Sequence, residues 1–535
     1  MSTTQIFALL VALTIGLSSS LRAQVQTGST PQPAPNAPLE LPDFLVTGKA
    51  VVDIAAGVKQ SPQKPARFAT SDLDSLNPTE KFPSPTVPNR SLPRFSRERI
   101  VNNSYIDGLF GMYTSPMLAA GTSFTAGEYR IDADLDAGYS RDWQPNARIL
   151  DIGANVSSAY VAPEKFYLFG KGLTETDVSV RHREFTLFAT PDAPVRSSTK
   201  LYAGISTEAF VGERPIVAHL HWNLHSLQDL DGESVKDQRV HGDITGSIGK
   251  RFSASMNIDM QSVAGQSYPY AEAQIARTFG DSLLRFRAAL GAQYGASTGD
   301  MARMGLLVDV RVDYEPSELF TYGATVRSGL RQVRFSDLLQ INPYLSASTL
   351  IDQPYDIIHV GLFAKHHPSQ RVQIVAGMEF RQTTRSAIWV DTVAGVFDVE
   401  YRDVTALSAR LEMSYQPTSR DRVLLTGIVQ TAVTSSDVTV TYTEPIRLDA
   451  AYRRYWTSSL TSEIGLQYVG RRWADLGNSR EIDAFLDLHA RLSYALGHGM
   501  DLVVTADNLV NSTIILWNGY RERGIFVSAG VSWRL

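Results

Sequence analysis

The sequence predicts an all-β protein: a transmembrane antiparallel β-barrel of about 22 strands, preceded by a proline-rich, mostly extended N-terminal segment. Three observations support this fold class. Apolar and polar residues alternate with a period of two from about residue 103 to the C-terminus, the alternating segments are long, and short connections alternate with longer ones. The mean hydropathy of -0.12 is compatible with a membrane barrel, because such strands mix lipid-facing and water-facing residues.

The two-residue alternation predicts strands with one apolar and one polar face. Successive side chains of a strand point to opposite faces, so residues at i and i+2 share a face. The clearest segments are Phe252–Gln261, Leu284–Tyr294, Arg303–Tyr314, Arg371–Arg381 and Ile482–Tyr494. Helical spacing fits none of them. They run for about 10 to 13 residues, whereas strands of soluble sheets most often have about 5–6 residues and a tilted membrane strand needs roughly 9–11.

The connections and the aromatic residues fit the same barrel. The short connections are Gly249–Arg251, Glu315–Glu318, His367–Gln370 and Leu496–Gly499, and the longer ones are 227–237, 332–355, 472–481 and 509–522. Short periplasmic turns and long outer loops are typical of outer-membrane barrels. Aromatic residues beside the short turns predict a girdle at one interface: Phe252, Tyr314, Phe320, Tyr415, Tyr452, Tyr494 and Trp533. Tyr139, Tyr294 and Tyr468 are expected at the other interface.

The N-terminal region divides into two parts. Residues 1–23 are predicted to be a signal peptide, because the apolar run Ile6–Leu17 is too short to span a bilayer and Ala23 is a small residue suited to cleavage. Residues 24–102 contain 12 of the 25 prolines and are predicted to be a mostly extended periplasmic or lumenal segment. One β-prone island interrupts it at 43–52. The barrel follows at 103–535, and we expect the chain in the outer membrane of a Gram-negative bacterium.

Composition and motifs exclude several functions. A formal net charge of -5 gives no basic field for nucleic acid. The chain has no cysteine, so it forms no disulfides or thiolate metal sites. No phosphate-binding Gly-rich loop with Gly-Lys-Ser/Thr and no His-Glu-x-x-His motif occurs, and we predict no enzyme activity, no catalytic residues and no cofactor.

Two groups of predicted lumen residues have alternative interpretations. His219, His221 and His225 share one strand face, and His241 lies on a nearby strand. Imidazoles bind zinc, copper or nickel, but the same-face spacing of about 7 Å is wide for one ion, so we favour ordinary polar lumen residues and predict no metal site. The second group consists of arginines: Arg285, Arg287, Arg303, Arg311, Arg327, Arg371, Arg381 and Arg410. They either attract anionic solutes or, as we favour, pair with Asp309, Asp313, Glu379 and Glu412.

The chain resembles TonB-dependent receptors at both ends of the barrel. Leu502–Asn511 resembles their penultimate strand with its Asn-Leu-Phe-Asp-like corner, and Asn518–Leu535 resembles their final loop and closing strand, although that strand usually ends in Phe. Phe110–Thr114 is similar to the opening of those barrels. Asp43-Phe44-Leu45-Val46-Thr47-Gly48 resembles the Val-Thr-Gly stretch that introduces their plug, and it is our candidate for a TonB-box-like contact.

The resemblance implies an outer-membrane transport or receptor barrel that takes up or binds an unidentified solute. It departs from the family between Gly48 and the barrel, where the proline-rich segment is too short for a standard plug. Since 22-stranded transporters keep a plugged lumen, we expect the N-terminal segment or a partner to fill it, with an open channel as the remaining possibility. The alternative function is a structural or assembly subunit that hosts a partner protein or lipoprotein, or a passive channel. Expected partners are outer-membrane lipid and lipopolysaccharide, the barrel assembly machinery, and TonB or a lumen-filling lipoprotein.

Overall fold

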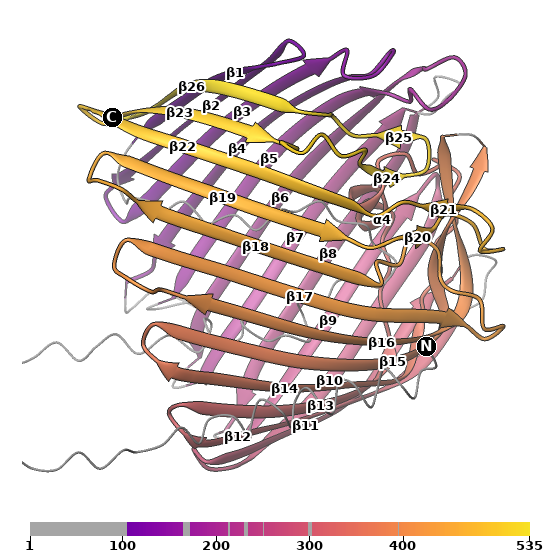
Figure 1. Ribbon diagram of the computed structural model, residues 1–535. Coiled ribbons are helices and arrows are strands. Elements are labelled where there is room, and N and C mark those ends of the chain that lie inside the picture. Colours follow the sequence, from indigo (N-terminus) through magenta and orange to yellow (C-terminus); the bar gives the residue numbers. More distant parts are fainter. Residues whose placement is uncertain are drawn as a thin grey trace, which may run out of the picture. The chain divides into compact units, whose positions relative to one another are not determined.

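The computed structural model describes residues 104–163, 172–211, 214–228, 234–249, 251–297, 302–393 and 395–535 (Figure 1). The predicted signal peptide, the proline-rich segment and its island at 43–52 lie outside these residues. The described chain forms one antiparallel sheet of 22 strands, which confirms the predicted fold class and strand number. Among the described residues, no helix is both long and apolar enough to cross a membrane.

The barrel strands follow one another around the sheet in chain order. They are β1 (Tyr105–Gly111), β2 (Ser115–Ala126), β3 (Tyr129–Arg141), β4 (Arg148–Val161), β5 (Leu173–Thr186), β6 (Val195–Val211), β7 (Arg214–Gln228), β8 (Ser234–Ile248), β9 (Phe252–Val263), β10 (Gln266–Gly280), β11 (Leu284–Ala296), β12 (Ala302–Ser317), β13 (Phe320–Leu330), β14 (Tyr355–Ser369), β15 (Val372–Val393), β16 (Val396–Tyr415), β17 (Asp421–Thr434), β18 (Ile446–Tyr455), β19 (Leu460–Val469), β22 (Phe485–Gly497), β23 (Met500–Asp507) and β26 (Phe526–Arg534).

The last strand closes the sheet on the first. β26 pairs with β1 from Tyr105 opposite Arg534 to Gly111 opposite Ser528. The backbone N–H of Leu535 also donates to the Ser104 carbonyl oxygen at 2.7 Å. Closure pairs every strand on both sides, so no sheet edge is left for lipid to meet.

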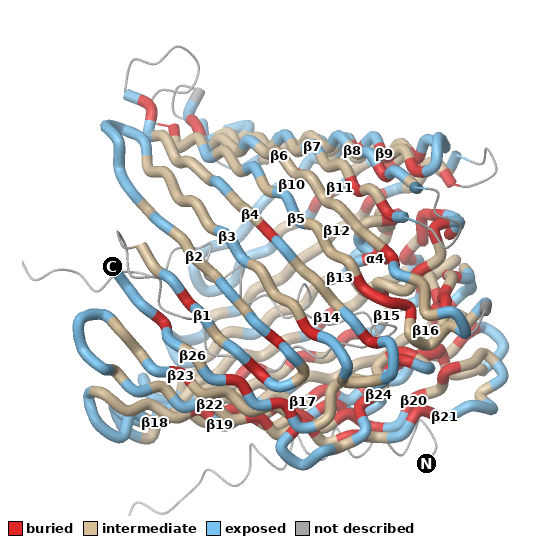
Figure 2. Tube along the Cα trace, turned by 90° about the horizontal axis from the view of Figure 1, so that it is seen from above, coloured by how far each residue is buried: buried red, intermediate tan, exposed pale blue. Residues whose placement is uncertain are grey.

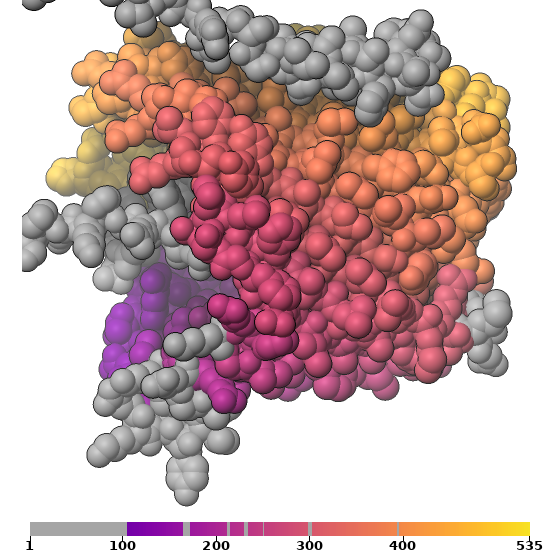
Figure 3. Space-filling view, turned by 90° about the horizontal axis from the view of Figure 1, so that it is seen from below, coloured from indigo at the N-terminus to yellow at the C-terminus, as the bar shows by residue number. Residues whose placement is uncertain are grey.

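The two faces of the wall differ as the alternation predicts. The outward face is apolar and exposed, with Met256, Ile275, Leu290 and Met304 among its side chains, and Figure 3 shows one side of the barrel surface. Polar side chains of the inward face are buried against one another, and Gln467 is fully buried. The barrel therefore presents hydrocarbon to lipid and polar groups to its lumen.

The two ends of the barrel also differ. At one end, which we call the turn end, most links are short, such as His498 and Gly499 between β22 and β23. The other end, the loop end, carries the long links, the helix α4 (Phe335–Ile341), and two hairpins made of β20 (Arg472–Trp473) with β21 (Glu481–Ile482) and β24 (Ile515–Trp517) with β25 (Tyr520–Arg521) (Figure 1). The asymmetry predicted from the sequence is thus present, although some loop-end links, such as 264–265, are short.

One predicted strand boundary is wrong. The segment Ile482–Tyr494 is not a single strand, because β22 begins at Phe485 and Ile482 belongs to the β20–β21 hairpin. Ile482 is buried among loop-end residues and does not face lipid. The alternation continues by chance from the hairpin into the strand, so periodicity alone could not place the break.

Candidate functional site

The long links of the loop end fold together into a layer that we call the cap. It consists of residues 331–354, 435–445, 470–484 and 508–525. The largest buried apolar cluster of the described chain joins these segments to the loop-end parts of several barrel strands. Figure 2 shows buried residues gathered around α4, β20 and β24. The cap is therefore a packed layer with its own apolar core. Independent surface loops would not share such a core.

Aromatic rings form the centre of the cap. The ring of Trp517 on β24 lies 5.1 Å from that of Trp389, 5.2 Å from Phe397 and 4.7 Å from Tyr442, measured between ring centroids. Trp389 and Phe397 are on β15 and β16, whose loop-end halves form an extended hairpin. Buried aromatic pairs contribute about 0.5–1.5 kcal/mol each beyond the area they bury. Trp517 thus connects the last link of the chain to the β15–β16 hairpin.

Buried polar contacts fasten the cap to the wall. Arg196 on β6 is almost completely buried, and its Nη1 donates to the Leu345 carbonyl oxygen at 2.7 Å. Arg334, at the start of α4, lies 3.6 Å from the Asp259 carboxylate on β9. Asp259 also accepts a hydrogen bond from Arg239 Nε at 2.5 Å. Hydrogen bonds of charged groups are stronger than neutral ones, so α4 is held at defined points of the wall.

A second polar group lies within the cap. Tyr442 donates to Asp391 Oδ1 at 2.8 Å, and Asn518 Nδ2 donates to the other oxygen of the same carboxylate at 2.7 Å. Burial, and then the Asp391 charge, raises the pKa of Tyr442. The phenol therefore stays protonated and keeps donating. Arg472 Nη2 similarly donates to the Ile515 carbonyl oxygen at 2.6 Å and joins two segments of the cap.

A lumen pocket of about 490 Å³ lies between α4 and the wall formed by β3 to β8. Its charged lining residues are Asp136, Arg181, Arg183, Lys200, Asp237, Arg239 and Asp337. Its volume falls in the range of small-molecule sites, which is about 300–1,000 Å³. A pocket with both signs of charge fits a polar solute that offers several hydrogen-bonding groups.

The centre of this pocket contains polar groups that the wall does not fully pair. Among the described residues, the Lys200 ammonium group makes no ion pair or hydrogen bond. His225 is buried, with Nε2 2.7 Å from the Ser198 hydroxyl and with Nδ1 unpartnered within the described chain. Asp237 is also buried and accepts a hydrogen bond from Gln261 Nε2 at 2.9 Å. Unpaired buried polar groups are costly, so Lys200 and His225 are the first candidates for ligand contact.

The histidines point into the lumen as predicted, but they separate into two sets. His219 and His241 share the Asp243 carboxylate, with nitrogen–oxygen distances of 2.9 and 3.2 Å. His221 Nδ1 lies 2.6 Å from the Tyr202 hydroxyl. His225 lies apart, in the pocket under α4. No group of three or more His, Asp or Glu side chains in the described chain has the arrangement of a metal site. These contacts favour the interpretation as polar lumen residues.

Four of the eight lumen arginines pair with the acidic residues favoured from the sequence. The confirmed ion pairs are Arg287–Asp309 at 3.5 Å, Arg311–Asp313 at 3.0 Å, Arg381–Glu379 at 2.5 Å and Arg410–Glu412. Arg285 pairs with Glu315 at 3.5 Å, whereas Arg303 and Arg371 donate to the backbone carbonyl oxygens of Gln353 and Pro417.

The candidate contact residues Asp43, Phe44, Leu45, Val46, Thr47 and Gly48 lie outside the described residues, as does the region of the expected plug.

Sequence reasoning did not find the pocket under α4. Its lining comes from six consecutive wall strands and one distant loop, which the alternation pattern treats alike. Only the helical residues 335–341, inside a long link, signal that this loop is structured.

Comparison with solved structures identifies the fold. The copper transporter OprC is 11% identical, with a TM-score of 0.62, covering 84% of this chain and 82% of that chain. The FrpB iron transporter from Neisseria meningitidis (F3-3 variant) is 8% identical, with a TM-score of 0.65 and 82% coverage of each chain. The ferric-catecholate import receptor Fiu from K12 E. coli is 10% identical, with a TM-score of 0.62, covering 83% and 82%. The fold is that of a TonB-dependent receptor barrel. No protein-family model matches this chain, and no curated protein matches it by sequence.

Proposed function

We propose that this chain is an outer-membrane transport or receptor barrel that binds a polar solute in the pocket under α4. The pocket, enclosed between the cap and the charged lumen wall, is the observation that carries the proposal. The apolar outer wall and closed sheet supply the membrane location. The packed cap argues against a passive channel, because its four links pack into one buried apolar cluster with the loop-end parts of the barrel strands.

The solute follows from the pocket and from the similar structures. Those structures are named as transporters or receptors for copper, iron and ferric catecholates. Metal ions and their chelates are therefore the first ligands to test, and the pocket contributes charged side chains of both signs together with Tyr202 and His225.

The coupling of uptake to energy is assigned to the N-terminal segment. A β-prone stretch such as Asp43–Gly48 can add a strand to the edge of a partner's sheet, which suits a TonB-box-like contact. Deletion of residues 24–60 is then expected to abolish energy-dependent uptake while leaving barrel assembly intact. Unchanged uptake would reject the coupling.

The binding part of the proposal has a separate test. Purified full-length protein is titrated with a ferric catecholate, whose negative charge the Lys200 ammonium group can pair with, and the same titration is repeated with Lys200→Gln and with Trp222→Ala. Lys200 lines the pocket, whereas Trp222 is exposed on the outer wall. Loss of binding only in Lys200→Gln supports the pocket. Absence of binding together with a stoichiometric copurified protein would favour an assembly subunit.

A further inference from the structure

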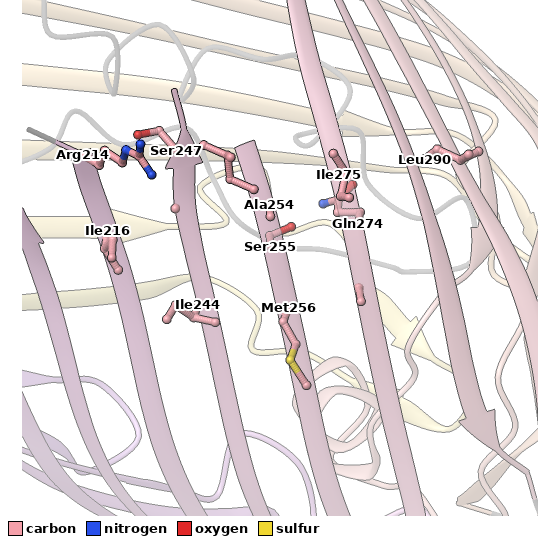
Figure 4. Close-up of a pocket in the computed structure, with 13 residues that line it drawn as sticks. Arg214, Ile216, Ile244, Ser247, Ala254, Ser255, Met256, Gln274, Ile275 and Leu290 are labelled. Atoms are coloured by element: carbon pink, nitrogen blue, oxygen red, sulfur yellow. The ribbon is translucent and has the colours of Figure 1, made fainter. Parts of the chain in front are cut away.

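The outer wall of the barrel carries a hollow across β7 to β11, with a volume of about 650 Å³ (Figure 4). The centre of the hollow is a row of residues that pair with one another across neighbouring strands. Gly246 on β8 pairs with Ile216 on β7 and with Ala254 on β9. Ala254 in turn pairs with Ile275 on β10, which pairs with Leu290 on β11.

The shape of the hollow follows from side-chain size along this row. Gly246 and Ala254 contribute almost no side chain, whereas Ile216 and Ile275 on either side are bulky. A Cβ atom built on Gly246 would lie 3.5 Å from Ile216 Cγ1 and 4.0 Å from the Pro215 carbonyl oxygen, which are ordinary van der Waals contacts, so a larger side chain could enter the space above it. The residues of the next row away from the turn end, Ile244 and Met256, are apolar and exposed. The lining suits a hydrocarbon chain.

The next row toward the turn end carries positive charge on both sides, with Arg214 in the lining of the hollow and Arg277 just beyond it. Ile248 pairs with Phe252, and Phe252 pairs with Arg277. The Arg277 guanidinium lies over the rings of Phe252 and Phe279, 4.9 and 4.5 Å from their centroids. Arg214 lines the other side of the hollow (Figure 4). Neither arginine forms an ion pair within the described chain. Two unpaired arginines at the level of an aromatic girdle match the height of lipid phosphates.

We propose that this hollow binds one glycerophospholipid, with an acyl chain over Gly246 and Ala254 and the phosphate group between Arg214 and Arg277. The proposal rests on the outer-membrane location proposed above. The arginines belong to the turn end, which faces the periplasm in barrels of this kind, so the lipid comes from the periplasmic leaflet.

Native mass spectrometry of the full chain tests the site. Protein purified in detergent is mixed with phosphatidylglycerol, and lipid retention is measured for wild type, Arg214→Gln/Arg277→Gln and Gly246→Val/Ala254→Leu. Wild type is expected to retain one lipid. Loss of both arginines should weaken retention roughly 30-fold, because each basic residue at a membrane surface contributes about 1 kcal/mol. The second double variant fills the hollow with β-prone apolar side chains, so it should lose the lipid while the barrel still folds.

A matched arginine supplies the control. Arg454 also lies at the turn end, over the Trp456 ring at 4.4 Å, but it is 3.5 Å from the Asp421 carboxylate and is distant in the sheet from β7 to β11. Arg454→Gln should retain lipid as wild type does. Equal retention by wild type and Arg214→Gln/Arg277→Gln overturns the site, and so does preferential retention of lipid A over phosphatidylglycerol. A wild-type protein that stays dissolved without detergent would instead refute the membrane location.

Discussion

Replacing Trp517 by alanine tests whether the cap is a cooperative layer. The Trp517 side chain is almost fully buried and contacts Trp389, Phe397 and Tyr442. Removing a large buried aromatic side chain typically costs about 3–5 kcal/mol. The strand ladders do not depend on this residue, so the loss falls on the cap, and the barrel remains closed.

The population of open cap should rise accordingly. Since 1.4 kcal/mol is a factor of ten, opening is expected to increase roughly 100-fold to several thousand-fold. Limited trypsin digestion reports it, because Arg480 lies in the β20–β21 hairpin and is half exposed, with Nη2 3.2 Å from Asp391 Oδ2. Cleavage after Arg480 should accelerate strongly in Trp517→Ala, and the conductance of the barrel in planar bilayers should increase.

Trp222→Ala is the matched control for this experiment. Trp222 is 42% exposed on the outer wall, so its loss leaves the cap core intact. The reasoning is refuted if Trp517→Ala is cleaved at the wild-type rate while its circular dichroism shows an intact barrel. It is refuted equally if Trp222→Ala opens the cap to the same extent.

Three further predictions concern single contacts. Arg196→Met should lower the free energy of cap opening by about 1–3 kcal/mol, because the buried Leu345 carbonyl oxygen loses its donor. Arg196→Lys should recover part of this free energy, and the rate of trypsin cleavage measures both variants. Gly323→Ala should lower the free energy of unfolding of the barrel by about 1–3 kcal/mol, since a Cβ atom there would overlap the Phe363 ring. Adding Phe363→Leu should restore this free energy, as measured by thermal unfolding. Burial alone would raise the pKa of Asp475, but hydrogen bonds from backbone N–H groups of its own hairpin hold that pKa below its usual range. The contribution of this carboxylate is therefore present above the unfolded pKa of about 3.9 and is lost as the pH falls through the lower folded value. The hydrogen-exchange protection factors of 470–484, taken relative to the intrinsic exchange rate at each pH, should fall at acid pH in wild type and lose this pH step in Asp475→Asn.

The strand pattern could be predicted because it is local. Phe252–Gln261 alternates strictly, and β9 begins at Phe252 with its apolar side chains outward. The strand ends were less predictable at the loop end. Ile482 continues the alternation of β22 but belongs to a separate hairpin, because burial in the cap, and not pairing in the barrel, decides its position.

The candidate site could not be predicted because its parts are far apart in the chain. Lys200 and Asp337 lie on β6 and α4 and line the same pocket only after the link 331–354 folds back across the loop end. The favoured pairing of the lumen arginines was accessible from the sequence, since each confirmed partner lies two residues along the same strand or on the neighbouring strand. Contacts such as Arg196 with Leu345, which span 149 residues, have no such local signature.

The alternation in the sequence is enough to assign an apolar and a polar face to each strand, since a period of two places each side chain on one face whatever the register. Contacts between distant segments set the path of the long links, which fold into a cap whose aromatic core forms only when four distant segments meet. The hollow over Gly246 and Ala254 has the same origin, because strand register places these two residues side by side. Periodicity fixes the face of a residue, and only pairing fixes its neighbours.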